Sequence, residues 1–132
     1  MGTRTAAGVQ PVAKILVVDD DPLVRFVTAD HLQDAGFEVV EAPSADGALP
    51  LLEAGDGIAA LVTDVQMPGS MNGLELAQIV RRRWPSLPIV VVSGYAPPQL
   101  GTVPAGATFL TKPYDPDELL RCLAALPGEQ GH

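Results

Sequence analysis

The chain has 132 residues and a formal net charge of −8, with 47% hydrophobic and 18% charged residues. These values favour one packed domain, and the negative charge disfavours direct binding to nucleic acid or anionic lipid. The single cysteine, Cys122, excludes an internal disulfide, and without a signal peptide or a long apolar run we expect a cytoplasmic protein.

The first elements along the chain are predicted to be a leader, a strand and a helix. Residues 1–13 are small and polar, which indicates a flexible leader. The apolar run Ile15–Val18 predicts a buried strand. Either Asp20 or Asp21 can cap the helix that follows, which begins at a proline and stops at a glycine.

A second strand, a short helix and a third strand come next. Phe37–Glu41 reads as the strand, and Ser44 can cap a helix over Ala45–Ala54. Pro50 lies inside this helix, so we expect it to shorten or distort it. Ile58–Thr63 predicts the third strand.

The rest of the chain predicts two more strands and two helices. A helix over Gly73–Trp84 should stop at the following proline, and Ile89–Val92 should be the fourth strand. The proline-rich segment Tyr95–Ala105 allows a short helix or none. Thr108–Leu110 predicts the fifth strand, and Pro116–Leu126 the last helix.

Five apolar strands that alternate with helices predict an α/β fold with a doubly wound parallel sheet. The expected strand order is 2-1-3-4-5, the flavodoxin-like order, with a short or irregular fourth helix. We expect one domain over residues 14–127 and a flexible tail over 128–132. Ligands of such sheets bind at the carboxyl ends of the strands, near the switch point between strands 1 and 3.

A polar residue follows or ends four of the predicted strands. These residues are Asp19–Asp21, Asp64, Ser93 and Lys112. Because the carboxyl ends of parallel strands meet at one edge, we expect these side chains to form one oxygen-rich pocket. Several carboxylates in one pocket repel a phosphate, so the pattern favours a site for a divalent cation together with a phosphoryl group.

These segments resemble the receiver domain of two-component response regulators. The resemblance lies in Ile15–Asp21, in Asp64–Pro68 followed by Asn72-Gly73, in Val92–Gly94 and in Lys112-Pro113. The resemblance implies a signalling phosphoprotein that takes a phosphoryl group from a histidine kinase or a histidine phosphotransfer protein and then changes its binding to a downstream protein target. It implies no enzyme of the ordinary kind, because the domain only assists its own phosphorylation and dephosphorylation.

The resemblance also implies a role for each site residue. Asp64 would be the phosphate acceptor. Magnesium (Mg2+) would be bound by Asp64, directly by Asp20, and by the backbone carbonyl of Gln66. Asp19 would contact the metal in part through water. Lys112 would pair with the phosphoryl group.

Two further residues would carry the switch. The resemblance implies that Ser93 senses the phosphoryl group and that Phe109 rotates in response. It also implies a cis peptide bond before Pro113.

The sequence departs from the family pattern in two segments. The loop after Asp64 is one residue longer than the commonest pattern, with Asn72 where aspartate is usual. The proline-rich residues 95–105 fall where the family has its fourth helix. Members of the family can form homodimers through the surface that includes the fourth helix, and the resemblance leaves a homodimer of this protein open.

Other functions remain open from the sequence. A relay module that passes phosphate to another histidine fits nearly as well as a regulator of one target protein. A protein-binding module that works without phosphorylation is an alternative, and so is a small Mg2+-dependent phosphatase with Asp19 and Asp21 as an Asp-x-Asp pair. Arg81–Arg83 reads as a solvated helix end, and Cys122 as a packing residue.

Overall fold

The computed structural model describes residues 12–67, 69–94 and 103–124. Five parallel strands form one sheet in the order β2-β1-β3-β4-β5, which confirms the predicted order. The strands are β1 (Lys14–Val18), β2 (Glu38–Ala42), β3 (Ile58–Asp64), β4 (Ile89–Ser93) and β5 (Thr108–Thr111). The helices are α1 (Pro22–Asp34), α2 (Ala45–Glu53), α3 (Gly73–Arg83) and α4 (Pro116–Cys122).

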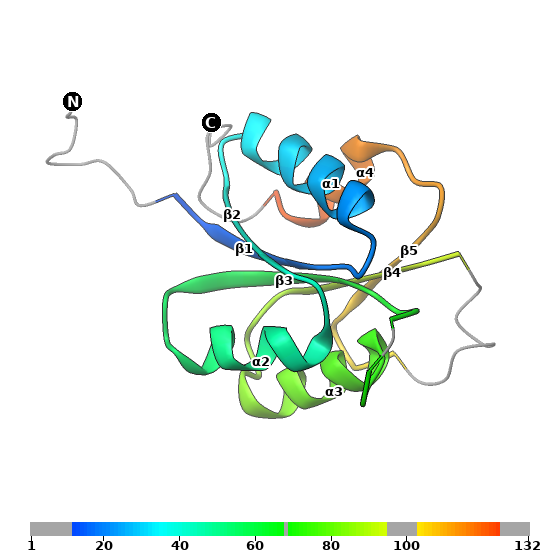
Figure 1. The fold of residues 1–132 in the computed structure, drawn as a ribbon. Helices are drawn as coiled ribbons and strands as arrows, with labels where there is room; N and C mark the ends of the chain where they lie inside the picture. Colours follow the sequence, from blue (N-terminus) through cyan, green and yellow to red (C-terminus); the bar gives the residue numbers. More distant parts are fainter. Residues whose placement is uncertain (1–11, 68, 95–102, 125–132) are drawn as a thin grey trace, which may run out of the picture.

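The helices cover both faces of the sheet. Figure 1 shows α1 and α4 on one side and α2 and α3 on the other. Successive residues of a strand point to opposite faces, so β1 sends Leu16 and Val18 toward α2 and α3, and Ile15 and Val17 toward α1 and α4. Burial on both faces explains why the central strands read as continuous apolar runs.

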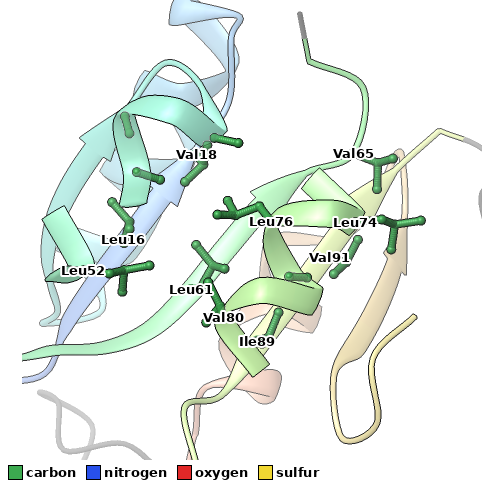
Figure 2. Packing of buried hydrophobic residues seen from close by; sticks show 14 residues of the cluster. Leu16, Val18, Leu52, Leu61, Val65, Leu74, Leu76, Val80, Ile89 and Val91 are labelled. Carbon is green, nitrogen blue, oxygen red and sulfur yellow. The ribbon is translucent and has the colours of Figure 1, made fainter. Parts of the chain in front are cut away.

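The core on the α2 and α3 side is built from aliphatic side chains (Figure 2). Leu61 and Val91 come from the sheet, and Leu76 and Val80 come from α3. All four are fully buried. This packing fixes α3 against the strands whose carboxyl ends carry the polar residues.

Side-chain caps define where the helices begin. Asp21, and not Asp20, caps α1, because its Oδ1 accepts hydrogen bonds from the backbone N–H groups of Leu23 and Val24. Asn72 caps α3 in a reciprocal pair with Glu75. The asparagine in the long loop therefore has a structural role that the sequence reading did not assign.

Three predicted helix ends need correction. The helix α2 continues through Pro50 and ends at Glu53. The helix α3 ends at Arg83. Trp84 leaves the helical conformation (φ −132°, ψ 78°), because that conformation is disfavoured for the residue before a proline. The helix α4 ends at Cys122, where the N–H of Leu123 bonds three residues back instead of four.

The proline-rich crossover is only partly described. Residues 95–102 lie outside the described part of the chain, and residues 103–107 contain no helix. Among the helices of the described residues, none has the length and apolar character needed to cross a membrane.

The backbone approaches closely where α3 begins. The N–H of Gly73 donates to the Val65 carbonyl at 3.0 Å. A Cβ atom added to Gly73 would overlap the backbone carbonyl oxygen of Asp64. Only glycine allows α3 to begin this close to the end of β3.

We expect Gly73→Ala to lower the free energy of unfolding by about 1–3 kcal/mol, because the methyl group must displace backbone. Chemical denaturation measures this loss. Gly47→Ala is the matched control, since an added Cβ there makes ordinary contacts in the first turn of α2. Equal stability of the two variants would contradict the close approach of α3.

Candidate functional site

The polar residues that end the strands lie together at one edge of the sheet. Asp19 follows β1, Asp64 and Ser93 end β3 and β4, and Lys112 follows β5. Strand pairing sets their positions, because β1 pairs with β3 and Asp64 is in register with Val92, the residue before Ser93. The structure thus brings these four predicted site residues to the same edge of the sheet.

Three carboxylates form a cluster at this edge. Carboxylate oxygens of Asp19, Asp20 and Asp64 lie within 4.8 Å of one another. Asp19 and Asp64 are buried, each with 7% of its surface exposed, whereas Asp20 is exposed. The cluster is therefore open to solvent on the side of Asp20.

One lysine faces the buried acids. Lys112 Nζ lies 2.9 Å from Asp64 Oδ1 and 4.0 Å from Asp19 Oδ2. The peptide bond between Lys112 and Pro113 is cis, as the resemblance implied. Within the described residues, one ammonium group faces three carboxylates, so these side chains keep an excess of negative charge.

Burial and mutual repulsion oppose ionisation of the acids. Burial raises the pKa of Asp64 above its ordinary value, and the Lys112 ammonium offsets only part of that rise. The pKa of Asp19 is raised mainly by burial as well, with a contribution from the negative charge of Asp64. Burial alone would lower the pKa of Lys112, but the neighbouring Asp64 carboxylate outweighs it, so this pKa is raised and the lysine stays charged.

The donor set fits a hard divalent cation. All three side chains offer carboxylate oxygens, the ligands that Mg2+ prefers. The buried Oδ1 of Asp64 has no hydrogen bond of ordinary geometry from any described residue, although Lys112 lies beside it. A cation would therefore meet an oxygen that is not saturated and would neutralise the excess charge.

The loop that carries Asp19 and Asp20 is fixed by backbone contacts. The N–H of Asp19 donates to the Ala42 carbonyl at 3.2 Å, and Asp19 Oδ1 accepts from the Asp21 N–H at 2.9 Å. Arg25 donates through Nη1 to the Asp19 carbonyl at 2.7 Å and through Nε to Glu41 at 3.0 Å. Sequence reasoning missed Arg25, although an arginine in the first turn after the acids was a usable signal.

The loop after Asp64 is also tied to its surroundings. Ser70 Oγ donates to Asp46 Oδ1 of α2 at 2.6 Å. Gly69 has a φ of 110°, a conformation that favours glycine. These contacts hold the loop with the extra residue against α2, and nothing in the sequence pattern pointed to Asp46.

Ser93 and Phe109 occupy different environments. Ser93 is fully buried, and its Oγ donates to the side-chain Oε1 of Gln66 at 3.0 Å. Phe109 is partly buried against the α2 and α3 core and is not part of the acidic cluster. The sequence had assigned Gln66 only a backbone role, so its side-chain contact is a new observation.

The basic run at the end of α3 is not a simple solvated helix end. Arg81 donates to the backbone carbonyls of Ala105, Pro85 and Leu87. Arg83 pairs with Glu53 and lies over the Trp84 ring, with 4.6 Å to its centroid. We therefore correct the reading of this run, because two of its three arginines make defined contacts.

The Asp-x-Asp arrangement of a phosphatase is not seen. Asp21 is exposed, and its Oδ1 is engaged as the cap of α1. The carboxylate cluster consists of Asp19, Asp20 and Asp64 instead. Asp64 therefore belongs to the cluster, whereas the phosphatase hypothesis rests on Asp19 and Asp21 alone.

Comparisons with known proteins agree with this geometry. The family model described as the response regulator receiver domain matches residues 15–124. The response regulator protein FleR of Pseudomonas aeruginosa is 34% identical over 126 residues, which cover 89% of this chain and 26% of that protein. An uncharacterized 14.6 kDa protein of Leptolyngbya boryana is 42% identical over 123 residues, covering 86% of this chain and 92% of that protein.

A solved structure matches as well. The response regulator protein TrrA of Thermotoga maritima, solved in complex with Mg2+ and BeF, has a TM-score of 0.78 and 28% identity. The match covers 86% of this chain and 98% of that one. The first curated relatives, by contrast, are longer, and this chain spans about a quarter of their length.

We expect Mg2+ to raise the unfolding temperature of the protein, because a ligand that binds only the folded state stabilises it. At about 100 times the dissociation constant the gain is about 2.7 kcal/mol. Asp20→Asn and Asp64→Asn should reduce this gain, since each removes a charged oxygen ligand. Differential scanning calorimetry with and without Mg2+ measures it.

Asp30→Asn is the matched control, because Asp30 is an exposed acid of α1 outside the cluster. It should keep the full gain. A gain that Asp64→Asn retains in full, or that Asp30→Asn loses equally, would contradict a metal site at the cluster.

Proposed function

The chain belongs to the response regulator receiver domain family, and on that premise we propose that it receives a phosphoryl group on Asp64 and passes on a signal. The proposed receiver extends over residues 14–127. The observation that carries the proposal is the position of Asp64. It is buried beside two further acids, with Lys112 Nζ 2.9 Å from its Oδ1.

Magnesium is the cofactor that this acidic cluster fits. Asp19, Asp20, Asp64 and the backbone carbonyl of Gln66 would hold it. When bound, the cation neutralises the carboxylates and a phosphoryl oxygen, which lowers the repulsion that otherwise excludes phosphate. The complex of TrrA with Mg2+ and BeF, a relative with 28% identity, supports this assignment.

Phosphoryl transfer asks the protein mainly for position and charge. In the proposed step an Asp64 carboxylate oxygen forms a bond to phosphorus while the bond from phosphorus to the donor histidine nitrogen breaks. That nitrogen keeps the electron pair and takes a proton from water. The Lys112 ammonium stabilises the negative charge on the transferred group.

The phosphorylated state is temporary because acyl phosphates hydrolyse. A water oxygen then bonds to phosphorus, the bond to Asp64 breaks, and inorganic phosphate leaves with the carboxylate restored. The protein is therefore a signalling phosphoacceptor and not an enzyme that turns over an external substrate.

Ser93 and Phe109 would report the phosphoryl group to the surface. Ser93 lies at the end of β4, next to the strand that ends in Asp64, so its hydroxyl is proposed to donate to a phosphoryl oxygen. Phe109 lies on β5 in register with Val91. A shift of β4 toward the phosphoryl group would therefore reach Phe109 through this pair, and we propose that its rotation changes the binding of a protein target.

A receiver domain implies a histidine kinase or phosphotransfer partner. This chain is 34% identical over 118 residues to part of the sensor kinase/phosphatase CqsS of Vibrio cholerae, of which it spans 17%. Segments similar to this chain therefore occur both in a sensor kinase/phosphatase and in a response regulator protein. Relay to a second histidine and control of one target are both consistent with the site.

We expect incubation with acetyl phosphate and Mg2+ to add one phosphoryl group to the wild type. Asp64→Asn should remain unlabelled, because an amide is not a phosphoryl nucleophile. Intact-mass spectrometry measures the gain, and chelation of Mg2+ should abolish it.

Asp46→Asn serves as the control, since Asp46 is an acid that contacts Ser70 outside the cluster. It should still be labelled. A label that survives Asp64→Asn would move the acceptor to another acid. No label on the wild type from acetyl phosphate or from phosphorylated kinases would favour a module that binds its partner without phosphorylation.

A further inference from the structure

The side chain of Gln66 has a partner that no part of the proposed function uses. Gln66 Oε1 accepts a hydrogen bond from Ser93 Oγ at 3.0 Å. Ser93 is fully buried at the end of β4, whereas Gln66 is exposed, two residues after Asp64. The contact thus joins the proposed sensor of the phosphoryl group to the loop that follows the phosphoacceptor.

The strands hold these two residues side by side. The N–H of Val65 donates to the Val92 carbonyl at 3.0 Å, which continues the pairing of β3 with β4 beyond Asp64. Gln66 follows Val65 along the chain, and Ser93 follows Val92. Their side-chain contact therefore lies directly beyond the last backbone hydrogen bond between these two segments.

A serine hydroxyl carries only one proton that it can donate. In the described structure Ser93 uses that proton toward Gln66. In the proposed function the same hydroxyl donates to a phosphoryl oxygen on Asp64. One proton cannot make both hydrogen bonds at full strength, so the two acceptors compete.

Resting on the proposed function, we propose that the Gln66 side-chain carbonyl is a latch that holds the Ser93 hydroxyl in the unphosphorylated protein. Forming the phosphorylated state then requires the Ser93 hydroxyl to break its hydrogen bond to Gln66 and to donate to the phosphoryl group instead. Gln66 acts through Ser93 and is a positioning residue. Its amide sets how strongly the site holds a phosphoryl group without changing the acids or Lys112.

The test removes the acceptor and keeps the length of the side chain. Gln66→Met replaces the amide with a thioether, which is a weak acceptor. Beryllium fluoride, the group present in the TrrA complex, serves as the phosphoryl mimic. Isothermal titration calorimetry with every variant saturated in Mg2+ gives its dissociation constant.

We expect Gln66→Met to lower this dissociation constant by about two- to tenfold, the range that corresponds to one ordinary hydrogen bond. The gain must depend on Ser93. In a Ser93→Ala background the added Gln66→Met change should leave the dissociation constant unaltered, because the hydroxyl for which the amide competes is gone.

Gln33→Met is the matched control, since Gln33 is an exposed residue near the end of α1. It should leave the dissociation constant at the wild-type value. An unchanged or higher dissociation constant for Gln66→Met, or the same gain in the Ser93→Ala background, would overturn the latch.

Failure of the proposed function gives a different result. If the wild type does not bind beryllium fluoride at saturating Mg2+, both the phosphoacceptor assignment and the latch are overturned. Normal binding by the wild type with no response to Gln66→Met overturns the latch alone.

Discussion

The constraint on which the structure depends is the crowding of negative charge at one end of the sheet. Asp19, Asp20 and Asp64 keep carboxylate oxygens within 4.8 Å of one another, and two of these side chains are buried. Their mutual repulsion and loss of water oppose folding, and one lysine offsets only part of this. The rest of the fold must therefore hold the acids in place.

The parallel sheet supplies that rigidity. Aliphatic side chains pack on both of its faces, so the strand ends cannot move without disturbing two cores. Gly73 lets α3 begin directly against the end of β3, and Arg25 ties the first acidic loop to β2 through Glu41. A pocket held in this way is preorganised for a cation and a phosphoryl group, which is what phosphoryl transfer requires.

Much of the fold and the placement of the principal site residues could be predicted from the sequence. Continuous apolar runs that end in Asp64, in Ser93 and just before Lys112 are recognisable in the sequence, and parallel strands bring such ends together without further information. The contacts between Ser93 and Gln66, and between Ser70 and Asp46, could not be predicted. They depend on how side chains meet across loops, and no periodic pattern records that geometry.

The most direct test of the account is a crystal structure of the protein with Mg2+ and beryllium fluoride. The account predicts the cation on Asp19, Asp20, Asp64 and the Gln66 carbonyl. It also predicts the fluoride group on Asp64, within hydrogen-bonding distance of Lys112 and Ser93. A cation bound away from the three acids, or beryllium fluoride bound on any residue other than Asp64, would contradict it.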